Sequence, residues 1–167
     1  MTTLAEDEEL RRKLLAAAEE HGAAVVHVAE EDGQPPYAFS VGAWRQLGVP
    51  EVIVIGLAPQ VAQAVVDTYV DRCRAGERFT PGQLYDGFLQ ECRVTFERVL
   101  DRYYPEWFGH AFLVYRAGTF PALQLVVPTP DGAWPWQPDA PPGFDTWQPL
   151  LTASGGPESW TPGVDGP

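Results

Sequence analysis

The residues best suited to contact a ligand lie in the segment Tyr-Ala-Phe-Ser-Val-Gly-Ala-Trp, residues 37–44, and directly after it. Alternate side chains of a strand point to opposite faces, so Ser40, Gly42 and Trp44 would share one face. Small residues at such positions let a ligand, or a tightly packed helix, approach the sheet. Trp44 and Arg45 add an aromatic wall and a guanidinium. These groups suit a carboxylate or phosphate ligand, although a surface salt bridge is the more ordinary role of such an arginine.

Three side chains farther along the chain could face the same pocket. Gln124 interrupts an otherwise apolar strand, and a buried amide must find hydrogen-bond partners, either in a ligand or in the proline-rich C-terminal segment. Trp134 and Trp136, separated by one proline, could close a pocket or hold that segment against the domain. We therefore predict that a ligand site would lie where residues 37–57 meet residues 124–136.

Other residue types that do chemistry are present without the spacing that chemistry requires. The histidines, His21, His27 and His110, do not form an H-x-x-x-H pattern, so we predict no metal site. His110 follows Glu106 by one helical turn, which could orient an imidazole for acid–base work or be an ordinary i,i+4 pair. No G-x-S-x-G elbow, phosphate loop or C-x-x-C motif occurs, which disfavours a covalent hydrolase and leaves enzymatic activity uncertain.

Composition narrows the classes of partner. The 167 residues contain 23 acidic and 11 basic side chains, a formal net charge of -12, which would repel nucleic acid and anionic membranes. No stretch approaches the roughly 20 apolar residues of a membrane span. Cys73 and Cys92 lack the repeated spacing of a disulfide framework, so we interpret them as reduced thiols. Together with the absence of a signal peptide, these features predict a cytoplasmic protein.

Periodicity predicts the elements that position these residues. Thr3 and Glu6 form a capping box that opens a helix over residues 4–21, and Pro59 opens a second helix that ends near Gly76. A third helix is predicted after Pro105. Strands are predicted at 23–44 (a hairpin with a longer loop), 52–57, 92–100 and 120–127.

The C-terminal residues differ from the rest of the chain. Residues 128–167 hold ten of the 17 prolines and four of the six tryptophans, which argues against regular helix or interior strand. We predict a single domain over residues 1–150 and a flexible tail over 151–167. The fold class is α+β, with a mostly antiparallel sheet that is open or partly closed like a split barrel, about three helices and a Pro/Trp-rich C-terminal wrap.

Several of these segments together resemble a known family. His21-Gly22, residues 37–44, Pro50-Glu-Val-Ile-Val-Ile-Gly-Leu57 and residues 124–136 are similar to the bacterial family catalogued as domain of unknown function 4262. The resemblance implies a cytoplasmic, single-domain bacterial protein and carries no established catalytic residue. The order of elements is also similar to flavin-reductase-like split barrels. That similarity implies a fold, while a flavin cofactor is a weaker expectation because a basic and hydroxyl-rich phosphate grip is missing.

Two functional hypotheses follow. In the first, the chain is a small-molecule or cofactor-binding protein, or an accessory enzyme, with a pocket of a few hundred Å³. In the second, it is a non-catalytic protein-interaction module, forming a homodimer or contacting another protein through its aromatic residues. The candidate ligand-binding residues are Tyr37, Ser40, Gly42, Trp44, Arg45, His110, Gln124, Trp134 and Trp136.

Overall fold

Two long helices and a five-stranded sheet form the framework of the computed structural model, which describes residues 3–167. The elements in chain order are α1 Leu4–His21, β1 Ala24–Val28, β2 Tyr37–Val41, α2 Ala43–Leu47, β3 Glu51–Ile55, α3 Pro59–Arg74, β4 Thr95–Arg98, the 3-10 turn η1 Asp101–Tyr103, α4 Tyr104–Trp107, α5 Ala111–Val114, β5 Ala122–Val126 and α6 Phe144–Trp147. The α+β class is confirmed. Within the described residues, no helix is both long and apolar enough to cross a membrane.

The sheet is mostly antiparallel, as predicted, and its strand order is β1-β2-β3-β5-β4. Among the five strands, only β3 and β5 pair in parallel, and the connection between them contains α3, β4, η1, α4 and α5. The sheet is open, with β1 and β4 at its two edges, so the partial closure suggested by the split-barrel similarity is absent.

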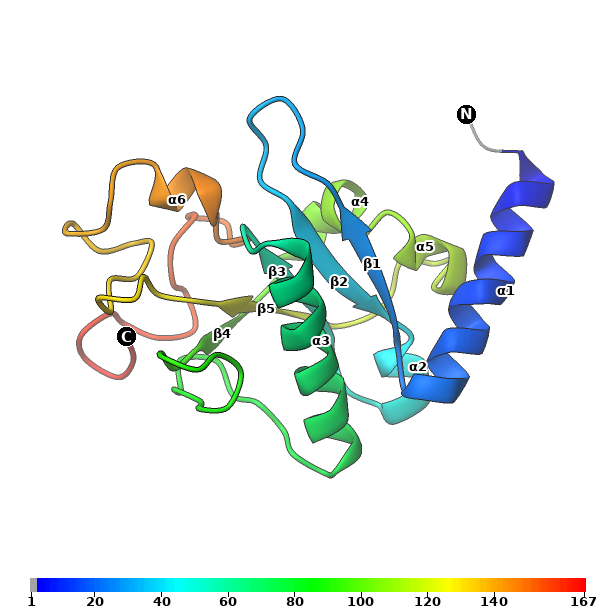
Figure 1. Cartoon of the computed structure of the whole chain (residues 1–167), viewed down its shortest axis with the longest axis horizontal. Helices are drawn as coiled ribbons and strands as arrows, with labels where there is room; N and C mark the ends of the chain where they lie inside the picture. The colour runs from blue at the N-terminus through cyan, green and yellow to red at the C-terminus, as the bar shows by residue number, and fades with distance from the viewer. Residues whose placement is uncertain (1–2) are drawn as a thin grey trace.

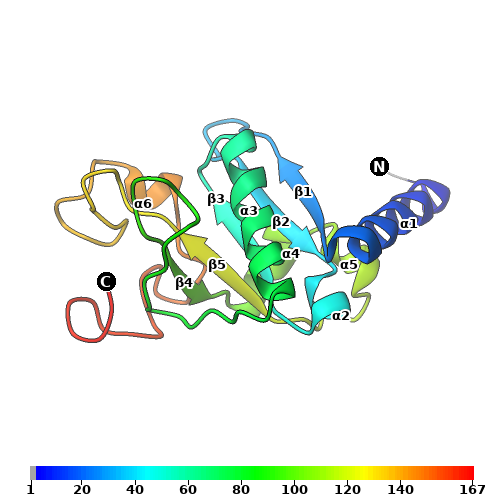
Figure 2. The same cartoon turned by 60° about the horizontal axis from the view of Figure 1, so that its bottom comes forward.

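Helices cover the two faces of the sheet differently (Figures 1 and 2). The long helix α3 lies along one face, where Val52 and Val54 of β3 pack against its apolar stripe. The short helices α4 and α5 lie on the other face with α1 beside them, and Ile53 and Ile55 point into that second core. Because β3 alternates between two buried layers, it is apolar at every position after its first residue.

Local signals account for the two long helices. Thr3 and Glu6 form the expected capping box, and α1 ends at Gly22 in the left-handed region, with φ of 97°. Pro59 is in the first turn of α3, as predicted. These helices have 18 and 16 residues.

Three predicted elements are wrong in extent. The hairpin's second strand ends at Val41, and residues 43–47 form the short helix α2 instead of a continued strand and connector. The predicted helix after Pro105 is two single-turn helices, α4 and α5, interrupted around Gly109, since glycine is a poor helix former. The predicted strand at 92–100 is reduced to Thr95–Arg98.

The C-terminal residues wrap around the β4 side of the molecule, shown in orange to red in Figure 1. They contain only the single-turn helix α6, in keeping with their proline content. Trp134 and Leu150 pack on Val126 of β5, and Trp160 is buried. Flexibility of residues 151–167 remains a prediction; the position described for them is against the domain.

Candidate functional site

Most of the predicted residues of segment 37–45 meet around Glu51, the first residue of β3. The Glu51 carboxylate is fully buried and accepts hydrogen bonds from the Ser40 hydroxyl at 2.7 Å and the Tyr115 hydroxyl at 2.5 Å. Three backbone N–H groups at the start of α2 also donate to it. These belong to Gly42 at 3.0 Å, Ala43 at 3.1 Å and Trp44 at 3.1 Å. We call this arrangement the Glu51 cluster.

The Glu51 cluster joins four parts of the fold: the end of β2, the start of α2, the start of β3 and the residue after α5. Burial raises the pKa of the Glu51 carboxyl, and hydrogen bonds from Tyr115, Ser40, Trp44 and Gly42 offset part of that rise. Burial and the nearby Glu51 also raise the pKa of Tyr115, so its hydroxyl remains protonated. The carboxylate is therefore satisfied by five donors from the described part of the protein itself, and the cluster acts as a structural junction.

Gly42 has a separate reason to be glycine. Its φ is 109°, and a Cβ atom built there would lie 2.5 Å from the Cβ of Ala18 in α1. The small residues of this segment thus admit a helix, which is the packing alternative to a ligand. Trp44 is 43% exposed on α2, and Arg45 is exposed beside it.

Gln124, Trp134 and Trp136 form a different group, on the side of the C-terminal segment. The Gln124 amide donates to the Pro149 carbonyl at 2.8 Å and accepts from the Leu151 N–H at 3.0 Å. The rings of Trp134 and Trp136 are stacked, with centroids 5.4 Å apart and planes 9° apart. The hydrogen bonds of Gln124 hold residues 149–151 to the domain, and Gln124 makes no hydrogen bond with the Glu51 cluster.

His110 is exposed at the break between α4 and α5. Because α4 ends at Trp107, His110 and Glu106 do not lie on one continuous helix as the sequence predicted. Among the described residues, no group of three or more His, Cys, Asp or Glu side chains is arranged to hold a metal ion.

A hollow of about 380 Å³ lies between the β1–β2 loop and α4, and Tyr37 is the predicted residue that reaches it. We call it the hairpin cleft. Its lining residues are Val28, Ala29, Glu31, Asp32, Gln34, Pro35, Tyr37, Glu106 and Trp107. The volume is within the range of small-ligand sites.

Aromatic rings form one wall of the hairpin cleft. The rings of Tyr37 and Trp107 have centroids 4.7 Å apart and are tilted by 58°. The Tyr37 hydroxyl donates to the Glu106 backbone carbonyl at 3.4 Å, and Trp107 is anchored in the core. Phe39 also stacks with Tyr37, with ring centroids 6.2 Å apart. The wall is therefore held by the sheet and by α4 together.

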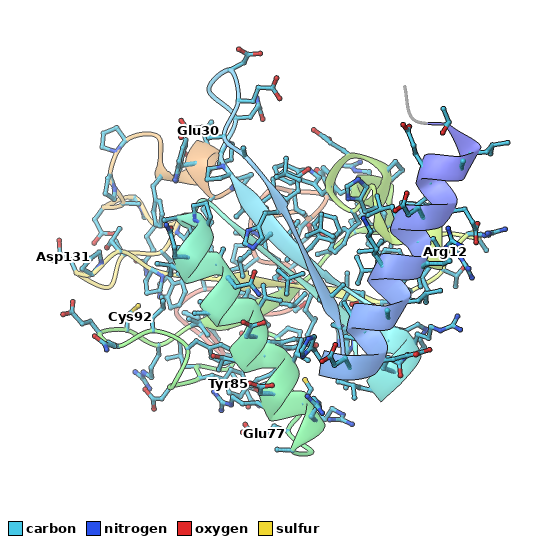
Figure 3. All side chains as sticks on the ribbon, turned by 45° about the vertical axis from the view of Figure 1, so that its right-hand side comes forward. Arg12, Glu30, Glu77, Tyr85, Cys92 and Asp131 are labelled. Carbon is cyan, nitrogen blue, oxygen red and sulfur yellow. The ribbon has the colours of Figure 1, made fainter. Side chains whose placement is uncertain are left out.

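A tight turn shapes the part of the cleft that the β1–β2 loop lines. Asp32 and Gly33 both have positive φ, 49° and 79°, as a type I′ hairpin turn requires, and Glu31 and Gln34 exchange backbone hydrogen bonds across it. Figure 3 shows this loop, just beyond Glu30, standing clear of the sheet with oxygen-tipped side chains at its end. The carboxylates of Glu31 and Asp32 are thereby carried on a defined turn.

The charge of the hairpin cleft has one sign. Three of its lining side chains, Glu31, Asp32 and Glu106, are carboxylates, and none of the lining residues is Lys, Arg or His. Burial and the Glu106 carboxylate raise the pKa of Tyr37, as expected where the local potential is negative. An aromatic wall beside carboxylates is the chemistry that recognises organic cations.

Sequence reasoning missed Glu51, Tyr115 and Trp107, and it considered Glu106 only as a partner of His110. The first was visible as an acidic residue directly before a wholly apolar strand, a position where burial requires hydrogen-bond partners. The sequence contains no signal for the contact between Tyr37 and Trp107, because these residues are 70 positions apart and no local spacing encodes it.

Comparison with known proteins gives one match. A family model described as domain of unknown function (DUF4262) matches residues 17–141, which is more than half of the chain. No curated protein and no solved structure matches the chain.

Proposed function

Since this chain belongs to the DUF4262 family, whose description specifies no activity, we propose from its geometry that it binds a small organic cation in the hairpin cleft. The ligand would be an amine or a quaternary ammonium compound. The observation that carries the proposal is the Tyr37–Trp107 pair in a cleft that three carboxylate side chains also line, with no basic side chain among the lining residues.

Organic cations fit this cleft better than metal ions or anions. A metal ion needs several oxygen or nitrogen ligands converging at about 2 to 2.6 Å, and the described residues offer no such group. An anion would meet three carboxylates and no compensating cation among the lining residues. The net charge of -12 would also attract cations from a distance.

The proposal is for binding and includes no reaction. The lining side chains include no Ser, Thr, Cys, His or Lys that could serve as a nucleophile. We place the protein in the cytoplasm, in keeping with its two free cysteines.

Titration calorimetry with matched ligands tests the proposal. We expect choline, tetramethylammonium or a diamine to bind, and 3,3-dimethylbutan-1-ol, the uncharged counterpart of choline, to bind at least about tenfold more weakly, because cation–π and charge terms together contribute more than about 1.4 kcal/mol. The same panel includes flavin mononucleotide, for which the weaker flavin expectation predicts binding. Equal affinity for charged and uncharged ligands would refute a cation site.

Two variants localise the binding. Glu106→Gln removes a carboxylate and Tyr37→Leu removes an aromatic face, and each should weaken choline binding about threefold to tenfold, since each interaction contributes about 0.5–1.5 kcal/mol. Glu19→Gln, an exposed change on α1, is the matched control and should leave affinity unchanged. Binding that survives both cleft variants would place the cation elsewhere.

A further inference from the structure

The C-terminal segment, residues 144–160, is attached to the sheet much as a bound peptide would be. Gln124 of β5 supplies one donor and one acceptor to the main chain of Pro149 and Leu151, two residues apart, which is the spacing at which a neighbouring strand would bond. The Leu100 N–H donates to the Leu151 carbonyl at 2.8 Å, and the Tyr103 hydroxyl donates to Thr152 at 3.1 Å.

A second polar side chain holds the end of the segment. Glu97 of β4 lies directly across from Gln124 in the sheet, and its carboxylate accepts from the N–H groups of Glu158 at 2.8 Å and Ser159 at 3.0 Å and from the Ser159 hydroxyl. Glu97 and Gln124 are each only 1% exposed. Within residues 3–167, the segment supplies every hydrogen bond to these two side chains apart from the one donated by the adjacent Arg98 N–H.

The start of the segment is attached by reciprocal contacts. Gln148 donates to and accepts from the backbone of Val127, at 2.7 and 2.9 Å. The Trp147 indole N–H donates to the Gly56 carbonyl at 3.0 Å, and a Cβ atom at Gly56 would lie 2.9 Å from Trp147. We call the surface made by Gly56, Glu97, Leu100, Gln124 and Val127 the segment groove.

The link between the domain and this segment makes few contacts of its own. Residues 138–143 read Pro-Asp-Ala-Pro-Pro-Gly, and all except Ala140 are exposed. Their backbone hydrogen bonds are local: Ala140 donates to Gln137, Phe144 donates to Pro141, and Thr146 and Trp147 donate to Gly143. The family model ends at residue 141, within this link, so the segment that fills the groove lies outside the matched domain.

We propose that the segment groove also accepts residues 144–160 from a second copy of this chain, which gives a dimer with exchanged C-terminal segments. Every groove contact above would be reproduced in the exchanged pair, because the same residues supply it, and only the path of residues 138–143 changes. This proposal concerns the interaction hypothesis and is independent of the hairpin cleft.

The balance between the two forms follows from effective concentration. A short link presents the chain's own segment at an effective concentration on the order of millimolar, so the monomer dominates at micromolar protein. Two copies with a net charge of -12 each also repel one another, and added salt screens that repulsion. Exchange should therefore become dominant when the link is too short to reach its own groove.

Shortening the link is the first test. Deleting Pro141 and Pro142 shortens the path by up to about 7 Å. The expected result is a dimer by size-exclusion chromatography with light scattering at 150 mM salt. Replacing the same two prolines with glycines keeps the reach and should leave a monomer. A folded deletion variant that remains monomeric would overturn the proposal.

Capture of the segment in trans is the second test and does not depend on the deletion variant folding. A fluorescent peptide of residues 144–160 is added to the full chain carrying Trp160→Ala, which weakens the chain's own segment and leaves the groove intact. We expect the anisotropy of the peptide to rise as it binds. Adding Gln124→Ala should weaken the affinity of the peptide at least about tenfold, because two hydrogen bonds are lost. Exchange would be refuted if the peptide did not bind, or if it bound equally well with and without Gln124→Ala. Equal binding of a peptide with the same residues in scrambled order would also refute it.

Discussion

Replacing Glu51 with Gln tests whether the Glu51 cluster stabilises the fold. The carboxylate accepts five hydrogen bonds, two from hydroxyl groups and three from backbone N–H groups. Glutamine keeps the shape of the side chain and one acceptor oxygen, but its amide nitrogen cannot accept. If that nitrogen replaces Oε1, the Ser40 hydroxyl can rotate, whereas the Ala43 N–H cannot and loses its acceptor.

The magnitude follows from that loss. A buried N–H without an acceptor costs about 1–3 kcal/mol, so we expect Glu51→Gln to lower the free energy of unfolding by about 2 kcal/mol at pH 7. Glu51→Ala leaves all three N–H groups without the carboxylate and should cost more than about 3 kcal/mol. Urea denaturation followed by circular dichroism measures both values.

Two comparisons make the result interpretable. Glu19→Gln changes the same residue type on the exposed side of α1 and should stay within about 0.5 kcal/mol of the wild type. Tyr115→Phe removes one hydroxyl donor to Glu51, so a double-mutant cycle with Glu51→Gln should show a coupling energy of about 1 kcal/mol. If Glu51→Gln unfolds at the same urea concentration as Glu19→Gln, the cluster is not a stabilising junction.

Three further predictions follow from the same contacts. Burial raises the pKa of Glu51 above its ordinary value of 4.5, so the folded state binds this proton more tightly than the unfolded state. The deficit of Glu51→Gln relative to wild type should therefore be fully present below pH 4.5 and shrink as pH rises through the raised pKa of the folded state, and a deficit that grows over that range would contradict the direction of the shift. Gly42→Ala should lower the free energy of unfolding, measured by urea denaturation, by about 2–3 kcal/mol, because both its φ of 109° and the Ala18 contact oppose a side chain. Gly48→Ala is the control, with φ of 69° and open space around it, and should cost about 1 kcal/mol. Equal costs would rule out the Ala18 contact as a cause. Gln124→Leu should speed hydrogen exchange of the Leu151 amide about tenfold while leaving β3 amides unchanged, and unchanged exchange at Leu151 would show that Gln124 does not hold the segment.

Local signals predicted the fold elements that depend on neighbours in sequence. The helix 4–21 is confirmed at both ends because its capping box and its terminal glycine act within one turn of the chain. The helix opened by Pro59 is confirmed for the same reason. The single helix expected after Pro105 is wrong because the apolar periodicity continues across Gly109, whereas the glycine disfavours helix and the backbone divides there into α4 and α5.

Long-range contacts account for what the sequence could not predict. Ser40 and Gly42 were recognised as unusual, but their partners, Glu51 and Ala18, are set by how β3 and α1 pack on the hairpin. Gln124 was correctly expected to need hydrogen-bond partners, and the structure shows that the C-terminal segment provides them. Whether the nine candidate residues bind a ligand stays a prediction, and Tyr37 is the one carried into the proposed site.

Gly56 connects the segment groove to the chain beside the hairpin cleft through its two backbone hydrogen bonds. Its carbonyl accepts from Trp147 of the segment, and its N–H donates to the carbonyl of Pro36, between two cleft residues, at 2.8 Å. Coupling would require this backbone path to have two arrangements, yet it continues the β2–β3 pair, which is buried on both faces. We therefore expect Trp160→Ala to change choline affinity less than twofold. A larger change would mean that the segment and the cation share a two-state element, and linkage would then require choline to shift peptide capture by the same factor.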